Sequence, residues 1–159
     1  LWPGEGRRRA TVLHRGERWE GEATWIDAEP AASLPVREPG PILFEPDPAV
    51  LAAGAVDALG QAHGLWRIDP SLGWLFGEAP AATPLARCYR ILRETPGRPR
   101  DVARAVADLG GGTVAVMPRG LRLDTDALQR RLSRPSGRLL VALWFRSGRR
   151  RRCFVAEPA

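Results

Sequence analysis

The chain has 159 residues, 44% of them hydrophobic, which is enough for one domain with a packed core. It contains no apolar run of about eighteen residues and no charged-then-apolar N-terminal segment, so neither a membrane-spanning helix nor a secretory signal is expected. Its net charge of +6 and isoelectric point of about 11.0 favour a polyanionic partner such as nucleic acid.

The positive charge has an unusual composition. All 24 basic residues are arginine, and the chain contains neither lysine nor asparagine. Alanine, glycine and proline are also abundant, which is typical of a GC-rich coding sequence. Codon bias and function therefore remain two open explanations, and clustering of the arginines would favour function.

The few cysteines and histidines predict no metal centre. Cys88 and Cys153 each lie in an apolar segment, so we expect two buried thiols in a reducing, cytoplasmic compartment rather than a disulfide. His14 and His63 are isolated, and no C-x-x-C pair is present.

The N-terminal residues predict a β-hairpin followed by a linker. Residues 9–13 and 19–25 have strand character, and Gly16 between them suits a tight turn. From residue 27 to residue 40 the chain is rich in proline and alanine, which indicates an extended linker. Because the first residue is Leu1 and not methionine, we expect a further part upstream.

A strand and one helix are predicted next. Residues 42–44 are apolar, and Asp47 followed by Pro48 is typical of a helix start. The apolar residues between Val50 and Leu59 predict one continuous helix, which is expected to end at Gly60 or Gly64. Residues 65–77 predict an irregular segment.

The C-terminal half has the clearest periodicity. Apolar spacing of three and four residues indicates helices, and β-branched runs indicate buried strands. Asp124 is placed as the cap of the second helix, and Ser147-Gly148 indicates a hairpin turn. The predicted elements are strand 86–92, helix 99–109, strand 113–117, helix 125–132, and strands 139–145 and 152–155.

This order predicts the fold class. Strand, helix, strand, helix, strand, strand gives a two-layer α/β sandwich with a mixed sheet. Right-handed crossovers would place both helices on one face of that sheet. The helical and irregular segment and the N-terminal hairpin precede this sandwich.

Several segments together resemble the THUMP-like domain that follows the catalytic region of bacterial class I S-adenosylmethionine-dependent methyltransferase-like proteins. The resemblance covers about residue 42 to the C-terminus. The segments that carry it are, in order, Phe44–Val50, Leu65–Pro70, Gly73–Glu78, Thr83–Leu92, Pro118–Gly120, and Asp124 with Leu128–Leu132. One departure is Met117-Pro118, where the family tends to have a lysine beside the Arg-Gly loop.

The resemblance implies a division into three parts. Residues 1–28 would be the terminal β-hairpin remnant of an upstream methyltransferase domain, residues 29–41 a Pro/Ala-rich linker, and residues 42–159 the THUMP-like domain. S-adenosylmethionine is implied for the upstream domain. No cofactor is assigned to this chain, because Gly110–Gly112 follow a helix and precede a strand, which is the wrong order for a phosphate-binding turn.

The candidate binding residues are basic or aromatic. Arginines could contact a phosphate backbone, and Tyr89 and Trp144 could stack on unpaired bases. Solvated arginines of a codon-biased protein are the alternative, and those near the end of a helix could instead stabilise its dipole. The candidate RNA-binding residues are Arg87, Tyr89, Arg90, Arg119, Arg122, Arg130, Arg131, Arg149, Arg150, Arg151 and Arg152.

No catalytic constellation is recognised. Asp47 fits a helix cap better than a methyltransferase loop, and the serines lack a nucleophile-elbow context. The sequence therefore predicts an accessory module, inactive by itself, that helps a methyltransferase domain in the same polypeptide to bind or position RNA. The alternative is a structural or protein-interaction module without nucleic-acid binding. Under both hypotheses, we expect neither a bound metal nor contact with a membrane.

Overall fold

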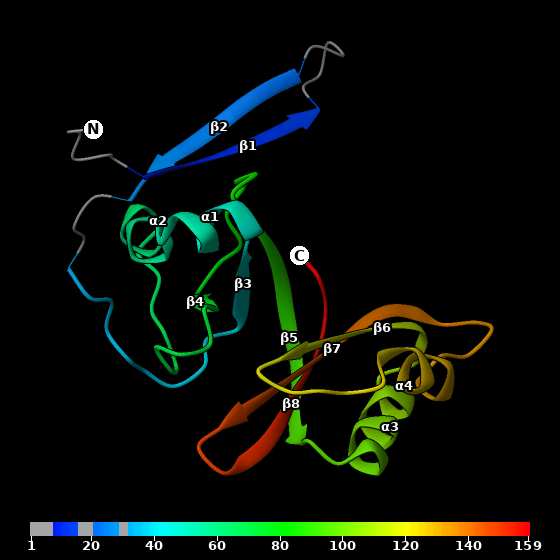
Figure 1. Ribbon diagram of the computed structural model, residues 1–159. Coiled ribbons are helices and arrows are strands. Elements are labelled where there is room, and N and C mark those ends of the chain that lie inside the picture. The colour runs from blue at the N-terminus through cyan, green and yellow to red at the C-terminus, as the bar shows by residue number, and fades with distance from the viewer. Residues whose placement is uncertain (1–7, 16–20, 29–31) are drawn as a thin grey trace. The chain divides into compact units, whose positions relative to one another are not determined.

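The computed structural model describes residues 8–15, 21–28 and 32–159, and it has an α/β architecture. The chain divides into two compact units, Leu1–Cys88 and Tyr89–Ala159 (Figure 1). Strand β5 (Ala86–Pro96) begins in the first unit and continues into the second. None of the helices in the described ranges is long and apolar enough to cross a membrane.

The first unit opens with the predicted antiparallel hairpin, β1 (Arg9–Arg15) and β2 (Gly21–Asp27). Its inner face carries Ala10, which is buried in a hydrophobic cluster with residues of the following helices. Its outer face exposes Leu13 and Trp25, with 77% and 57% of their surface accessible. The turn predicted at Gly16 lies outside the described residues.

Two short helices replace the single helix that we expected. Helix α1 (Pro48–Ala53) begins as predicted, because a side-chain oxygen of Asp47 accepts a hydrogen bond of 2.8 Å from the backbone N–H of Ala49. It ends at Gly54, whose φ of 71° is left-handed. Helix α2 (Val56–Ala62) then starts anew. The prediction of one continuous helix was wrong because it ignored the stop signal at Gly54.

A short strand was missed in the segment predicted to be irregular. β3 (Ile42–Pro46) pairs antiparallel with β4 (Leu75–Gly77). With three residues, β4 is too short to show an alternating pattern in the sequence. The predicted linker also takes part in the packing, because Leu34 is buried.

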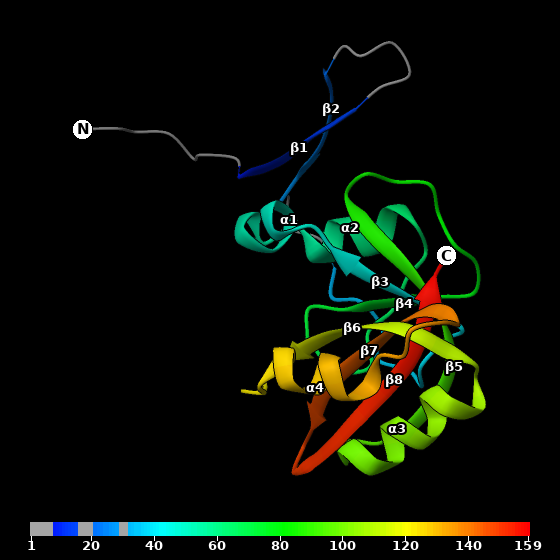
Figure 2. The same ribbon diagram turned by 90° about the vertical axis from the view of Figure 1, so that its right-hand side faces the viewer.

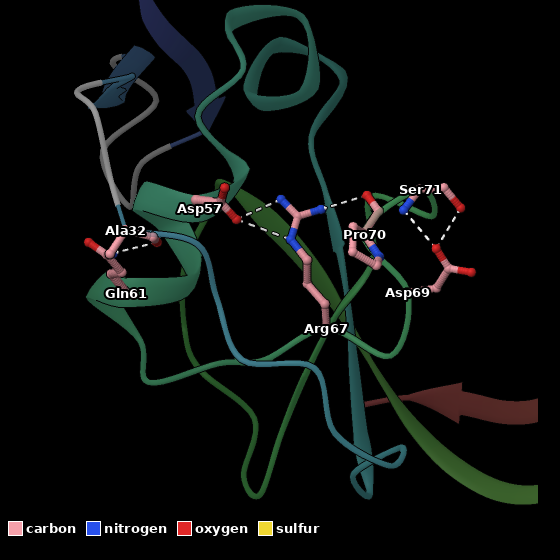
Figure 3. Close-up of polar contacts among 7 residues, drawn as sticks. All are labelled: Ala32, Asp57, Gln61, Arg67, Asp69, Pro70 and Ser71. Carbon is pink, nitrogen blue, oxygen red and sulfur yellow. Dashed lines mark hydrogen bonds and ion pairs between the residues drawn. The ribbon is translucent and has the colours of Figure 1, made fainter.

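Arg67 connects α2 to the loop that precedes β4 (Figure 3). Its guanidinium donates to one carboxylate oxygen of Asp57 at 3.0 Å and 2.7 Å, and to the carbonyl oxygen of Pro70 at 3.0 Å. In the same loop, hydrogen bonds from the Ser71 hydroxyl and backbone N–H lower the pKa of the Asp69 carboxyl. These contacts hold the loop of residues 67–71 in place, although it has no regular secondary structure.

The second unit contains the predicted mixed sheet. Its strand order is β5-β8-β7-β6, with β6 (Gly111–Arg119) parallel to β7 (Arg138–Ser147). Strand β8 (Arg150–Pro158) runs antiparallel to both of its neighbours. Helix α3 (Pro99–Asp108) joins β5 to β6, and helix α4 (Thr125–Leu132) joins β6 to β7.

Both helices cover the same face of this sheet, as predicted. One buried cluster joins Val102 and Val106 of α3 and Leu132 of α4 to alternate residues of the strands, among them Leu140 and Trp144. Figure 2 shows α4 and α3 next to β8, one on each side of it in this view. Asp124 caps α4 as predicted, because it accepts a hydrogen bond of 2.9 Å from the backbone N–H of Ala127.

The glycines between α3 and β6 serve backbone packing. A Cβ atom on Gly112 would lie 2.7 Å from the backbone nitrogen of Gly137, closer than side chains approach backbone atoms. In addition, the N–H of Arg138 donates to the carbonyl oxygen of Gly110 at 2.9 Å, and the N–H of Arg134 donates to that of Gly112 at 2.9 Å. These contacts hold the two ends of the β6–α4–β7 crossover together.

Candidate nucleic-acid interface

The topology of the second unit gives its sheet two distinct ends. We call one the hairpin end: it comprises the carboxyl ends of β5, β6 and β7, the β7–β8 turn, and the first turns of α3 and α4. The other, the α4 end, comprises the last turn of α4 and the starts of β6 and β7. There the hydroxyl oxygen of Ser133 accepts a 3.0 Å hydrogen bond from the backbone N–H of Val114 in β6.

The candidate arginines fall into two groups, one at each end. Those at the hairpin end follow β6 or lie on the β7–β8 hairpin, whose tip is visible in red at the lower left of the second unit (Figure 1). Most of them are exposed, and Arg119 and Arg152 are partly buried. The members are Arg119, Arg122, Arg149, Arg150, Arg151 and Arg152.

The second group does not join the first. Arg130 and Arg131 end α4, and Arg90 stands opposite Glu157, seven residues along β8 from Arg150. At a rise of about 3.3 Å per residue, that separation is roughly 23 Å. Arg87 precedes Arg90 on β5 and belongs to the first unit.

The two groups differ in their electrostatic setting. Arg130 and Arg131 lie in the last turn of α4, where the helix dipole favours cations. Their position therefore agrees with the alternative given above, in which they stabilise the helix dipole and bind no ligand. At the hairpin end, Arg151 lies instead next to the start of α3, because its carbonyl oxygen accepts a hydrogen bond from the N–H of Gly97, two residues before Pro99. The dipole at the start of a helix favours anions. The dipole of α3 therefore does not stabilise the positive charge of Arg151.

Two carboxylates at the hairpin end are already engaged. Glu94 forms an ion pair with Arg152, whose guanidinium also lies 5.4 Å above the ring of Phe145. Asp101 accepts a hydrogen bond of 2.8 Å from Arg98. The other carboxylate oxygen of Asp101 lies 3.8 Å from the guanidinium of Arg100.

Other arginines at this end make no ion pair or hydrogen bond through their side chains within the described ranges. They are free to meet a solvent-borne anion, and the strands fix the backbone beneath Arg146, Arg150 and Arg151. These residues are Arg122, Arg146, Arg149, Arg150 and Arg151.

A groove runs along the hairpin end between β5 and β8. It is lined by Glu94, Thr95 and Pro96 on one side and by Arg150, Arg151 and Arg152 on the other. A second, smaller groove next to it shares Glu94–Pro96 and is lined on its far side by the first turns of α3, with Asp101 and Arg104. Each groove therefore combines arginines with at least one carboxylate.

The two aromatic candidates are buried. Tyr89 is 6% exposed, and its hydroxyl lies 3.7 Å from the sulfur of Met117. Trp144 is 1% exposed, and its indole N–H donates to the carbonyl oxygen of Gly97 at 3.2 Å. Neither ring has an open face for a base, so both act as core residues in this structure.

Arg146 is an exposed residue near the end of β7. The structure pairs it directly with Arg151 across β7 and β8. This pairing could have been predicted from the two-residue turn at Gly148 and Arg149. Counting outward from the turn pairs Ser147 with Arg150 and then Arg146 with Arg151.

Other chemistries find little support in the described residues. No three His, Cys, Asp or Glu side chains in these ranges are grouped closely enough to hold a metal ion. Both cysteines are free thiols; Cys153 is buried as predicted, whereas Cys88 is only partly buried. Burial raises the pKa of the Cys153 thiol. Asp47 serves as the cap of α1.

Comparison with known families places this geometry in context. Residues 86–158 match the family model described as THUMP domain-like. The match begins at the first residue of β5 and ends at the last residue of β8, so it covers strands β5 to β8 and helices α3 and α4.

Full-length relatives carry a methyltransferase name. Two proteins of Mycobacterium tuberculosis, from strains H37Rv and CDC 1551, are each 32% identical to this chain over 142 residues and are named uncharacterized S-adenosylmethionine-dependent methyltransferases. The match covers 89% of this chain, which spans 37% of the length of these relatives.

A solved structure shares the fold. It is entitled "putative methyltransferase from Porphyromonas gingivalis W83" and superimposes with a TM-score of 0.66 at 16% identity. The superposition covers 87% of this chain and 35% of that protein.

Proposed function

Since residues 86–158 are a THUMP-like domain, we propose that this chain is an accessory module of an S-adenosylmethionine-dependent methyltransferase and helps to bind its RNA substrate. The observation that carries the RNA proposal is the set of hairpin-end arginines whose side chains make no ion pair within the described ranges: Arg122, Arg146, Arg149, Arg150 and Arg151. Such a surface recognises a phosphate backbone rather than particular bases.

The division of labour follows from the relatives. The larger part of each methyltransferase relative has no counterpart here, so we assign cofactor binding and methyl transfer to that part. In this proposal residues 1–28 are the terminal hairpin of the methyltransferase domain, and the module is inactive alone. The two free thiols agree with a reducing compartment such as the cytoplasm.

The binding test uses a fluorescently labelled RNA and measures anisotropy as salt is raised. With about four neutralised phosphates, affinity should fall roughly fiftyfold between about 50 and 200 mM salt, because counterion release sets the slope. The key variant changes Arg149 and Arg150 to serine at the hairpin end. Its matched control changes Arg130 and Arg131 to serine at the α4 end, with the same change in net charge.

We expect the first variant to lose most of its affinity and a salt slope smaller by about one to two, and the control to stay close to the original chain. Equal losses in both variants would mean that net charge alone drives binding. No binding by the original chain at low salt would overturn the RNA proposal.

One observation favours the second function, a protein-interaction module. The outer face of the β1–β2 hairpin exposes Leu13 and Trp25, and large apolar side chains exposed on one face often mark an interface. If this reading is right, Trp25→Ser weakens association with a separately produced methyltransferase domain and leaves RNA anisotropy unchanged. A calorimetric titration with S-adenosylmethionine should give no heat with this chain under either reading.

A further inference from the structure

Two cations stand directly opposite each other at the hairpin end. Arg146 on β7 and Arg151 on β8 are cross-strand partners in the antiparallel register. Side chains in such positions have Cβ atoms about 4.5–5.5 Å apart, and like charges placed there destabilise the pairing. The hairpin therefore holds together two groups that repel each other.

Elsewhere in the same sheet, arginines are paired with acids. Arg138 pairs with Glu157, and Arg152 pairs with Glu94. Arg146 and Arg151, in contrast, contact no carboxylate within the described part of the chain. The acids that line the two grooves are paired with other arginines: Glu94 with Arg152, and Asp101 with Arg98 and Arg100.

The backbone under Arg151 is firmly held. The N–H of Gly97 donates to the carbonyl oxygen of Arg151 at 2.9 Å. A Cβ atom at position 97 would lie 2.7 Å from the Cβ of Arg151, so only glycine permits this approach. Helix α3 starts two residues later at Pro99, which brings the positive end of its dipole to the same side.

An anion would resolve this arrangement. Two guanidinium groups side by side can each donate hydrogen bonds to the oxygens of one phosphate, and the helix dipole adds to the attraction. We propose that Arg146 and Arg151 form a phosphate clamp, which in the RNA complex of the proposed function holds a backbone phosphodiester. The clamp reads charge and geometry and not base identity.

The test compares the chain with Arg146→Thr, Arg151→Thr and the double variant, and with Arg130→Thr as a control of equal charge change. Threonine suits a strand and keeps the hairpin formed. Thermal unfolding is followed at low salt with and without inorganic pyrophosphate, and RNA affinity is measured by anisotropy.

Without an anion, each clamp variant should melt at or above the temperature of the original chain, because the repulsion is gone. Pyrophosphate should raise the melting temperature of the original chain and of the control, and should leave the double variant unchanged. RNA affinity should fall about tenfold in each single clamp variant, and the double variant should lose less than the product of the two, because the residues share one ligand.

The outcomes separate the clamp from the function on which it rests. If the original chain binds RNA and the clamp variants bind it as tightly as the control, the clamp is wrong and the RNA proposal stands. If RNA does not bind but pyrophosphate stabilises the chain through Arg146 and Arg151, the RNA proposal is wrong and the clamp serves a free phosphate compound. Clamp variants that melt well below the original chain, with the pyrophosphate shift intact, overturn the clamp.

Discussion

The indole N–H of Trp144 donates a 3.2 Å hydrogen bond to the carbonyl oxygen of Gly97, a residue 47 positions earlier in the chain. The bond joins the middle of the β7–β8 hairpin to the turn between β5 and α3. Gly97 in turn donates its N–H to Arg151. Gly97 therefore links the buried Trp144 to the backbone of the exposed Arg151.

Trp144→Phe removes the bond and keeps most of the apolar volume. The carbonyl oxygen of Gly97 then loses a buried donor, and we expect a loss of about 1–3 kcal/mol in the free energy of unfolding. Urea denaturation followed by circular dichroism measures it. An unchanged midpoint would show that the bond adds nothing, and Phe154→Leu provides a comparison that changes core volume without touching a hydrogen bond.

The ion pair between Asp57 and Arg67 predicts a clear loss on substitution. The Arg67 side chain is only 13% exposed, so Asp57→Asn leaves a poorly hydrated cation with a weaker partner. We expect a cost of about 1–2 kcal/mol. The matched control is Asp108→Asn, whose pair with Arg93 is about half exposed on both sides and should matter by less than about 0.5 kcal/mol. Equal effects in urea denaturation would contradict this ranking.

Gly112→Ala tests the backbone packing beside β6. The added methyl group would lie 2.7 Å from the backbone of Gly137, which has no flexible side chain to move aside. We expect a loss of about 2–4 kcal/mol in the free energy of unfolding. Gly120→Ala serves as the comparison, since its φ of 67° strains alanine but no atom lies within 4 Å of the new methyl, and it should cost about 1–2 kcal/mol. Thermal unfolding measures both variants, and a melting temperature of Gly112→Ala at or above that of Gly120→Ala would contradict the prediction.

Cys153 predicts a fall in stability at alkaline pH. Burial raises the pKa of its thiol in the folded state above the value of about 8.5 in the unfolded chain. The folded state therefore binds more protons, so the contribution is complete below about pH 8.5 and is lost as the pH rises from there, by at most about 1.4 kcal/mol per pH unit. Urea titrations between pH 7 and pH 10 measure the slope, and Cys153→Ala should flatten it.

The same residue offers a chemical readout. Cys88 is partly exposed and Cys153 is buried, so iodoacetamide should modify Cys88 first in the folded protein. Equal rates for the two thiols would contradict the burial of Cys153.

Local signals in the sequence were sufficient for much of the fold. The caps at Asp47 and Asp124 were predicted because capping depends on residues one to three positions away. The strands and helices of the second unit were predicted because their apolar periodicity is strong and their turns contain glycine. The break at Gly54 was missed because the apolar residues on both sides fit one helical face.

The binding surface depended on information that is not local. The sequence predicted Arg130 near a helix end and Arg150 on a hairpin, but it did not show which arginines lie at the same end of the sheet. The burial of Tyr89 and Trp144 was likewise not readable, since aromatic residues in strands occupy both cores and binding faces. Which residues meet at one end follows from strand order, and only the structure supplies that.

The close backbone contact between Gly112 and Gly137 also limits where related sequences can gain residues. The crossover from β6 through α4 to β7 is closed by backbone against backbone at its return, where the hydrogen bonds of Arg134 and Arg138 leave no room for extra residues. Its outgoing loop, residues 120–124, has no such closure. Natural insertions should therefore accumulate in that loop, beside the arginines of the hairpin end, so that homologous proteins can vary the rim of this surface while the sheet beneath it keeps its length.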